Sequence, residues 1–276
     1  MKKVRKYLIP ILIIVFATVM LVSIWQIMKT QLEYMDADTL YSEFQDKYVE
    51  TIPETTPGTE VIKESTDTSD TSVSEPNSTD TTSESETEAV PITVDFVSLL
   101  ADNGDVVGWI YCPNTPINYP VAQGKDNNEY LRHDLKGKYL VSGTLFVDYR
   151  NGLIGEGINY VIYGHNMKNQ TMFGTILKYK EQSYYDEHPV LYYLTPEQNY
   201  KLEPIAGLVV STEDMIYQPS PETDSFSEYV EKLVEKSGFQ SEAEYFPGDS
   251  IVTLSTCSYE FDTARYVLVC KLTEIE

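Results

Sequence analysis

The chain has few of the residues that build metal centres and disulfide scaffolds. Only three cysteines and three histidines occur among 276 residues, so neither a disulfide framework nor a structural zinc site is expected. Positive charge is also scarce, since 20 Lys and Arg stand against 43 Asp and Glu, a formal net charge of −23. Such an acidic chain is a poor general ligand for nucleic acid, because phosphate binding needs clustered basic side chains.

Several motifs of common enzyme classes are missing as well. The chain contains no Gly-x-Gly-x-x-Gly after a strand, no P-loop, no His-Glu-x-x-His, no Cys-x-x-Cys and no Gly-x-Ser-x-Gly. These absences argue against most nucleotide-binding, zinc-dependent and serine-hydrolase functions. No acidic pair is set in apolar surroundings, so a glycosidase has no support either. No metal and no cofactor are expected, and thiol chemistry remains.

The longest apolar run lies at the N-terminus. Residues 1–6 are a basic tail, and no charged residue occurs between Tyr7 and Met28. As a helix, residues 7–28 would rise roughly 33 Å, enough to cross a bilayer core. The positive-inside rule places the basic tail in the cytoplasm and the remainder of the chain outside the cell. A cleaved signal peptide is the alternative, but the run is longer than a usual signal core and no clear cleavage site comes after it.

A second helix is predicted directly after the apolar run, over residues 29–50. Leu40, Phe44 and Tyr48 recur every four residues, and an aspartate at 36 or 38 is available as its N-cap. This juxtamembrane helix is expected to stand between the membrane and the C-terminal remainder of the chain.

Residues 51–90 have the composition of a disordered linker. Roughly three quarters are Ser, Thr, Glu, Asp or Pro, none is aromatic, and ten carboxylates stand against one lysine. Such a segment cannot bury enough apolar surface to offset the entropy of ordering. We therefore expect a flexible, self-repelling tether, and we attribute its acidity to solvation first and to binding only second.

Residues 91–276 are predicted to form the folded domain, a mainly β structure. Short apolar runs punctuated by Gly, Asn, Asp and Pro indicate eight strands, which suggests a closed or nearly closed barrel. The predicted strands are Val106–Tyr111, Ile117–Val121, Gly143–Val147, Tyr160–Tyr163, Val190–Leu194, Tyr200–Val210, Ile251–Thr256 and Arg265–Leu272.

Three helical segments are predicted in the same domain, one before the first strand and two between strands. They are Asp95–Ala101, Thr171–Glu181 and Phe226–Ser237. Ser225 and Glu228 suggest a capping box for the third helix, whose apolar stripe is expected to pack on the barrel and not to bind a cofactor.

Cys257 is the best candidate nucleophile. It comes after an apolar strand and small hydroxyl residues, so that a rigid strand end could present its thiol at a surface groove. Cys112 and Cys270 lie in apolar surroundings and are interpreted as small buried hydrophobes. A disulfide between these two is compatible with an exported protein, but their spacing does not establish it.

A nucleophilic cysteine needs a proton acceptor and a group that stabilises the oxyanion. His165 is the best candidate acceptor, because it lies just past an apolar strand, where Gly164 would permit a sharp turn. His133 and His188 are interpreted as solvated surface residues. Arg265 opens the strand after Cys257, and two antiparallel strands joined by residues 258–264 would bring its guanidinium beside the thiol.

These residues resemble the sortases, the membrane-anchored cysteine transpeptidases of Gram-positive bacterial surfaces. The resemblance rests on Leu254–Cys257, with Arg265 eight residues after the cysteine and Tyr163–Met167 upstream. The helix predicted at 226–237 and five further segments resemble class B sortases in particular: Gly108–Ile110, Tyr119–Val121, Asp126–Asn127, Gly143–Phe146 and Asp148–Asn151. The resemblance spans about residues 95–273, and it departs from some class B members in the shorter connection after the cysteine and in the long acidic linker.

The resemblance implies an eight-stranded sortase-type β-barrel with N-terminal helices and an extra helix before the cysteine strand. Cys257 would attack the Thr carbonyl of a C-terminal sorting motif on a secreted protein and form a thioacyl-enzyme, which an amine of a peptidoglycan cross-bridge or a pilin lysine would resolve. His165 would act as general acid and base, and Arg265 would hold the substrate and the oxyanion. The resemblance also implies that four residues surround the substrate: Asn127, Leu131, Ser255 and Thr256.

Two other functions remain open from the sequence. A cell-wall cysteine hydrolase is the nearest enzymatic alternative, although such enzymes usually place the cysteine before the histidine in the chain, opposite to the order here. An anchored surface scaffold without catalysis is the other.

Overall fold

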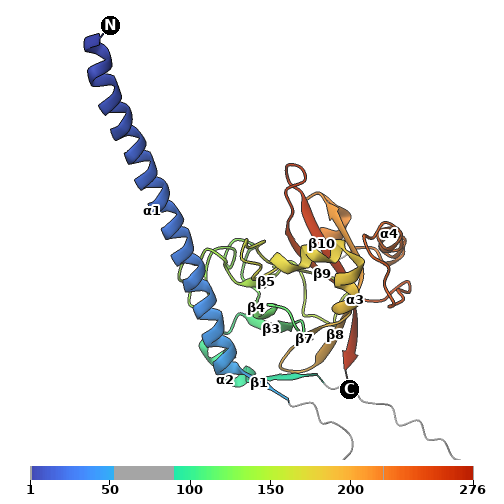
Figure 1. Cartoon of the computed structure of the whole chain (residues 1–276). Coiled ribbons are helices and arrows are strands. Elements are labelled where there is room, and N and C mark those ends of the chain that lie inside the picture. The colour runs from blue at the N-terminus through green and yellow to red at the C-terminus, as the bar shows by residue number, and fades with distance from the viewer. Residues whose placement is uncertain (1, 53–89, 220, 276) are drawn as a thin grey trace, which may run out of the picture.

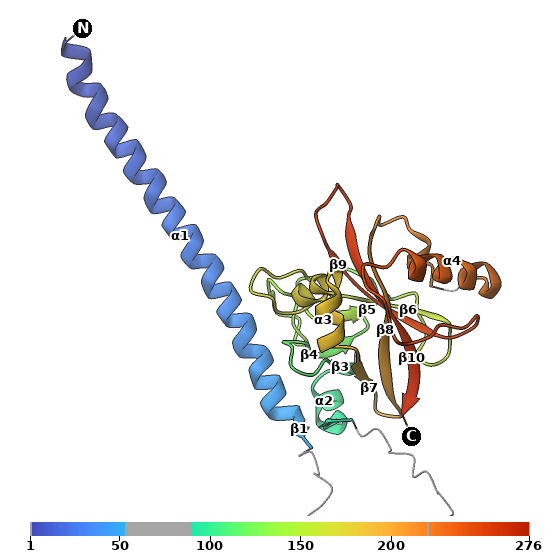
Figure 2. The same ribbon diagram turned by 45° about the vertical axis from the view of Figure 1, so that its right-hand side comes forward.

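A long helix and a β-barrel make up the computed structural model, which describes residues 2–52, 90–219 and 221–275. Helix α1 (Lys2–Tyr48) contacts the barrel with its C-terminal part, and its N-terminal part extends away from the barrel (Figure 1). Helix α4 (Thr223–Glu235) lies on the opposite side of the barrel from α1 (Figure 2).

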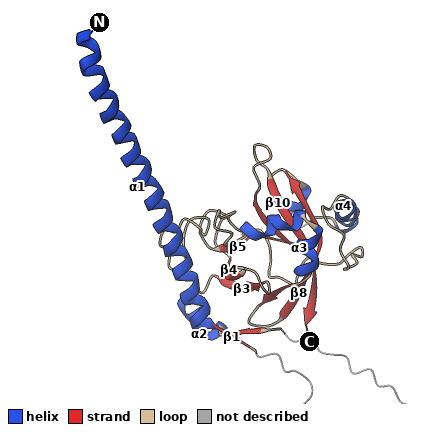
Figure 3. Cartoon of the chain, viewed as in Figure 1, coloured by secondary structure: helices blue, strands red, loops and turns tan. Residues whose placement is uncertain are grey.

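The barrel is closed by eight strands in the order β10-β8-β7-β3-β4-β5-β6-β9 (Figure 3). The pairs β4–β5 and β6–β9 are parallel, and the other pairs are antiparallel. The predicted barrel and its eight strands are confirmed, with ends shifted by a few residues at most. The observed strands are β3 (Val106–Tyr111), β4 (Asn118–Ala122), β5 (Leu145–Val147), β6 (Asn159–Tyr163), β7 (Leu191–Leu194), β8 (Asn199–Val210), β9 (Ile251–Cys257) and β10 (Arg265–Ile275).

Strands β9 and β10 pack against other parts of the protein on both faces, which explains why their sequences are continuous apolar runs. Successive side chains of a strand point to opposite faces. Leu254 and Leu268 belong to the main core, whereas Val267 and Val269 pack in a second cluster with Phe226 of α4. The predicted packing of the α4 stripe on the barrel is thus confirmed, and β9 carries Cys257 at the end of a rigid, fully packed strand.

Helix α1 corrects the predicted division of the N-terminal region into two helices. A single helix runs from Lys2 to Tyr48, with no break near residue 29 and no cap at Asp36. The physical reason is that no Gly or Pro separates the apolar run from the amphipathic segment, so composition changes while helix propensity does not. Residues 9–48 of α1 contain an 18-residue window with a mean hydropathy of 2.5, and none of this window is buried against the rest of the protein. By length and composition, this part of the helix could cross a membrane.

A short two-stranded sheet that the sequence did not predict comes directly after α1. Strand β1 (Val49–Thr51) pairs antiparallel with β2 (Ile92–Val94), and the Ile52 amide donates to the Pro91 carbonyl at 2.9 Å. Residues 53–89 of the predicted acidic linker are not among the residues that the structure describes. The two segments that flank them are hydrogen-bonded neighbours.

The smaller helices only partly match the predictions. Helix α2 (Phe96–Asp102) agrees, with Asp95 accepting from the Ser98 amide as N-cap. The helix predicted over Thr171–Glu181 is instead a 3₁₀ helix, η1 (Gly174–Lys180), and a separate helix α3 (Gln182–Glu187). Met172 has a φ of +53°, outside helical geometry, and therefore excludes a helix start at residue 171.

Helix α4 begins earlier than its predicted capping box. Its N-cap is Glu222, without a side-chain cap, and Ser225 lies inside the first turn, where its hydroxyl donates to the Glu222 carbonyl at 3.1 Å. The capping-box prediction was therefore wrong. A second 3₁₀ helix, η2 (Met215–Tyr217), lies between β8 and α4.

Candidate active site

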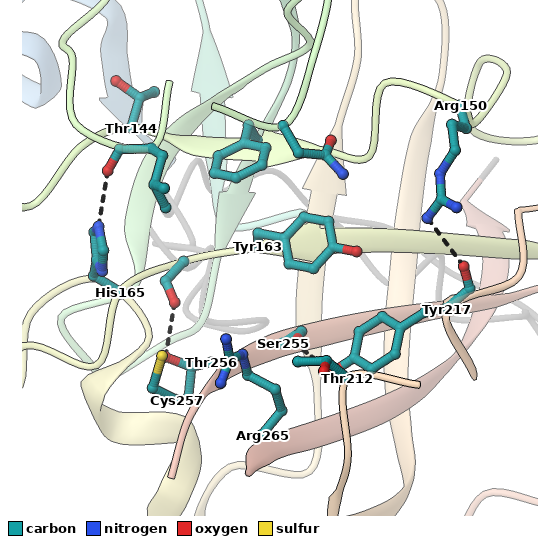
Figure 4. Close-up of a pocket in the computed structure, with 14 residues that line it drawn as sticks. Thr144, Arg150, Tyr163, His165, Thr212, Tyr217, Ser255, Thr256, Cys257 and Arg265 are labelled. Carbon is teal, nitrogen blue, oxygen red and sulfur yellow. Dashed lines mark hydrogen bonds between the residues drawn. The ribbon is translucent and has the colours of Figure 1, made fainter. Parts of the chain in front are cut away.

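A pocket of about 290 Å³ lies where β6 and β9 end and β10 begins. The three residues predicted for catalysis, Cys257, His165 and Arg265, all line it, as do all four predicted substrate residues. Figure 4 shows the side chains of Thr256, Cys257 and Arg265 on one wall of this pocket.

Cys257 and Arg265 are direct cross-strand partners. Cys257 is the last residue of β9 and Arg265 the first of β10, and the antiparallel register pairs one with the other. Side chains at paired positions project to the same face of a sheet, with Cβ atoms about 5 Å apart. Arg265 Nη1 donates to its neighbour's carbonyl, Ala264 O, at 3.0 Å. The strand pairing that the sequence predicted therefore places Arg265 beside Cys257.

The three cysteines differ in access to solvent. Cys257 is half-buried, whereas Cys112 and Cys270 are fully buried, and all three are free thiols, so the two buried residues form no disulfide. Burial raises the pKa of the Cys112 thiol to about 11 and that of Cys270 well above its usual value. Cys257 is thus the thiol that can react with an external substrate, and the buried-hydrophobe interpretation of the other two is confirmed.

His165 is held next to the cysteine strand by the residues on both sides of it. Strands β6 and β9 are parallel neighbours, and the Thr256 hydroxyl donates to the Gly164 carbonyl at 2.7 Å. The Asn166 side-chain amide donates to the Cys257 carbonyl at 2.8 Å. The histidine is therefore fixed between two hydrogen bonds to β9.

Gly164 has a role different from the predicted sharp turn. A Cβ at this position would lie 2.4 Å from a side-chain carbon of Leu145 and 2.5 Å from one of Phe173. Close packing of the backbone against the core, not a left-handed conformation, therefore requires glycine before His165.

The ring nitrogens of His165 are distinguished by one hydrogen bond. Nε2 lies 2.8 Å from the Leu131 carbonyl oxygen. A carbonyl only accepts, so Nε2 carries hydrogen and Nδ1 is left as the acceptor in the neutral ring. Burial lowers the pKa of His165, the bond to Leu131 opposes this, and the positive charge of Arg132 lowers the pKa further. The neutral base is favoured at pH 7.

The four predicted substrate residues reach the pocket in different ways. Asn127 donates to Asp148 Oδ2 at 3.0 Å, and Leu131 presents a side chain that is 38% exposed. Ser255 is hydrogen-bonded to the Tyr217 hydroxyl at 2.8 Å. Thr256 uses its hydroxyl for the Gly164 carbonyl described above. His133 and His188 do not line this pocket and are half-buried.

One buried carboxylate, missed by the sequence analysis as a site residue, connects several of the pocket residues. Asp148 accepts from Asn127, from the Tyr163 hydroxyl at 3.0 Å, and from Nε and Nη2 of Arg150 at 2.9 and 2.8 Å. Tyr163 in turn stacks on Tyr217, with ring centroids 6.2 Å apart and an interplanar angle of 10°. The charged pair directly after an apolar strand was the signal that could have revealed this network.

Replacing Asp148 by asparagine should destabilise the fold and change its response to acid. Burial raises the pKa of Asp148, but the hydrogen bonds from Arg150, Asn127 and Tyr163 outweigh burial and lower it overall. The stabilisation by the carboxylate is complete above the unfolded pKa of about 3.9 and is lost as the pH falls through the lower folded value. We expect Asp148→Asn to cost about 3 kcal/mol of unfolding free energy, measured by urea denaturation.

The control for this variant is Asp102→Asn, which removes the carboxylate of an exposed ion pair with Lys47. Its effect should be far smaller, because exposed ion pairs contribute little. Equal losses in the two variants, or an unchanged acid response in Asp148→Asn, would contradict the assigned role of the buried carboxylate.

Comparison with known proteins places these features in a family. The family model described as the sortase domain matches residues 110–273. The sortase B of Listeria monocytogenes is 37% identical over 174 residues, which are 62% of this chain and 70% of that protein. A solved structure of the Staphylococcus aureus sortase B–substrate complex is similar with a TM-score of 0.62 and 33% identity, and 66% of this chain and 85% of that chain are covered. For the Bacillus anthracis sortase B in complex with AAEK1, the TM-score is 0.66, the identity 30%, and the coverage 88% and 99%.

Proposed function

Since this chain belongs to the sortase B family of cysteine transpeptidases, we propose that Cys257, His165 and Arg265 carry out its transfer reaction. The substrate is a secreted protein with a C-terminal sorting motif, and the acceptor is an amine of a peptidoglycan cross-bridge or a pilin lysine. The observation that carries this proposal is the cross-strand pairing of Cys257 with Arg265 in the same pocket as His165.

The first half of the reaction forms a thioester. Nδ1 of neutral His165 takes the thiol proton, and the sulfur of Cys257 attacks the carbonyl carbon of the threonine in the sorting motif. The Arg265 guanidinium donates hydrogen bonds to the developing oxyanion. The tetrahedral intermediate collapses as His165 gives its proton to the departing amine, so the peptide C–N bond breaks and the thioester remains.

The second half of the reaction repeats these steps with the acceptor. The incoming amine attacks the thioester carbonyl, His165 takes the proton that the amine loses, and the Cys257 sulfur leaves and regains a proton. One amide is broken and one is formed, so the transfer reaction needs no external energy source or redox partner. Water is the competing acceptor and would give hydrolysis.

The N-terminal part of α1 is proposed to anchor the enzyme in the cell membrane. Its apolar side chains are exposed, for example Phe16 at 67% and Trp25 at 63%. The basic tail before residue 7 supports a cytoplasmic N-terminus with the catalytic domain outside. Because α1 continues unbroken into a segment packed on the domain, a retained anchor is favoured over a cleaved signal.

The transfer reaction can be tested with the full chain in detergent micelles. A library of peptides with C-terminal sorting-type motifs is incubated with the enzyme and triglycine, and products are identified by mass spectrometry. We expect amide-exchange products and a thioacyl adduct on Cys257. Hydrolysis alone at every triglycine concentration would indicate a cell-wall hydrolase, and neither product nor adduct would favour the non-catalytic scaffold.

Arg265→Ala should slow the transfer while leaving the fold intact. Loss of one oxyanion donor costs roughly 10²-fold or more in kcat. Arg265→Lys should recover only part of this loss, because lysine keeps the charge but not the planar fork. Single-turnover acylation with a peptide from the library measures the effect, and the melting temperature serves as the control. A rate within threefold of wild type in Arg265→Ala would show that another group holds the oxyanion.

A further inference from the structure

The C-terminal part of α1 is packed into the domain beside the candidate active site. Four side chains at helical spacing are buried there: Ala37, Tyr41, Phe44 and Tyr48. Tyr41 is 4% exposed, and the Gln45 side-chain amide donates to the Asn118 carbonyl at 2.8 Å. The same helix that supplies the apolar anchor therefore forms part of the core around β4 and the residues before β5.

The hydroxyl of Tyr41 contacts the wall that holds the catalytic imidazole. It donates to the Gly143 carbonyl and lies 3.4 Å from Oγ1 of Thr144, which lines the pocket. Gly143 has a φ of +57°, and a Cβ there would lie 2.4 Å from the Leu131 carbonyl oxygen. This Leu131 oxygen is the atom that accepts from Nε2 of His165. The Tyr41 hydroxyl is thus connected to the histidine by three successive contacts, through Gly143 and Leu131.

The ring of Tyr41 supports the other side of the same histidine. It packs edge-on against Tyr119, with centroids 5.0 Å apart and an interplanar angle of 81°. The Tyr119 hydroxyl accepts from the Met172 amide at 3.2 Å, and Met172 forms an antiparallel bridge with Asn166, the residue after His165.

A third contact joins α1 to the loop that begins at His165. The side-chain amide of Asn169 lies 3.2 Å from each carboxylate oxygen of Asp38. The Phe173 amide donates to the His165 carbonyl at 3.1 Å and closes this loop. Helix α1 therefore reaches His165 through the Leu131 carbonyl, through Met172 and through Asn169.

We propose that α1 positions the catalytic histidine, with Tyr41 as the main positioning residue. Tyr41 holds the Leu131 carbonyl and the Met172 backbone in place, which sets the orientation and the tautomer of the imidazole. This inference rests on the proposed function, in which His165 moves the proton. The membrane anchor and the proton-transfer group are consequently parts of one packed unit.

The test compares two buried tyrosines of the same helix in the full chain in detergent micelles. Tyr41→Phe removes the hydroxyl that reaches Gly143, and Tyr48→Phe removes one that donates to Asp102, outside the pocket. The chain holds only three histidines, so ¹⁵N NMR of labelled histidine can follow the tautomer and pKa of His165. The rate of iodoacetamide reaction at Cys257 against pH gives a second readout.

We expect Tyr41→Phe to change the Nε2–H tautomer population and the titration midpoint of His165. The same variant should lower kcat about fivefold to tenfold with KM within twofold of wild type. Tyr48→Phe should leave all of these unchanged. The exposed Asp38→Ala should shift His165 in the same direction by a smaller amount, about twofold in kcat, without a change in melting temperature.

Unchanged His165 resonances in Tyr41→Phe, or equal changes in both tyrosine variants, would overturn the positioning role. A different result would contradict the proposed function, namely a His165→Gln variant whose transfer rate and pH profile of Cys257 alkylation are those of the wild type. The NMR readout reports the position of the ring whether or not His165 proves catalytic, so the two failures are distinguishable.

Discussion

Replacing Cys257 by alanine should abolish amide exchange, with a fall in kcat on the order of 10⁴-fold or more, because the thioester can no longer form. Binding of the sorting peptide should persist, since the pocket walls are built mainly by other side chains. Cys257→Ser should accumulate no acyl-enzyme either, because its hydroxyl is far less acidic than a thiol and would form the corresponding ester only slowly. The measurement is triglycine exchange with the best library peptide, together with mass spectrometry of the intact protein.

Alkylation supplies the matched control for Cys257. Cys112 and Cys270 are fully buried, so iodoacetamide should modify the native chain once and remove all activity. The Cys257→Ala variant should take up no label under the same conditions. Residual exchange in this variant, or loss of activity through labelling at another cysteine, would show that the nucleophile lies elsewhere.

Replacing His165 by glutamine should lower kcat roughly 10² to 10⁴-fold, the usual contribution of a general acid and base. The glutamine amide can still donate to the Leu131 carbonyl, so the fold and the pocket wall should be preserved. The glutamine cannot exchange protons, however, and both the departing and the incoming amine would have to use water.

The pH dependence of the wild type should reveal the same group. Because burial favours the uncharged ring, the pKa of His165 is lowered below the usual 6.5. The imidazole acquires a proton only as the pH falls through this lowered value, and kcat/KM should then decline. This acidic limb should lie below pH 6.5 in the wild type and disappear in His165→Gln, while His188→Gln should keep the wild-type profile. An acidic limb retained in His165→Gln would exclude His165 as the titrating group.

The barrel was predictable because its strands carry their own signals. In β3, β9 and β10, apolar residues are bounded by turn residues, and the pairing of Cys257 with Arg265 results from a short connection between consecutive strands. The position of His165 was predictable only as the end of a strand, because the parallel pairing of β6 with β9 joins residues about 90 positions apart.

Features set by distant contacts were not predictable. Met172 adopts its positive φ in a loop fixed by Tyr119 and Asn166, and this delays the start of the predicted helix to Gly174. The continuity of α1 was missed because a change from apolar to amphipathic composition resembles a boundary even when no helix-breaking residue is present. Tyr217 reaches the pocket from the connection between β8 and α4, where no strand or helix periodicity marks it.

With α1 as the proposed membrane anchor, the pairing of β1 with β2 has a consequence for how far the enzyme can reach from the cell surface. Thr51 and Ile92 are paired across the two strands, and α1 leads directly from the apolar segment into the domain. Lengthening or shortening the chain between these partners would leave the height of the pocket above the bilayer unchanged, because closing a longer loop costs little and moves neither end. With this anchor, the distance of the pocket from the bilayer would be determined by the rise of one continuous helix, and the proposed substrates and acceptor amines would have to come to that height.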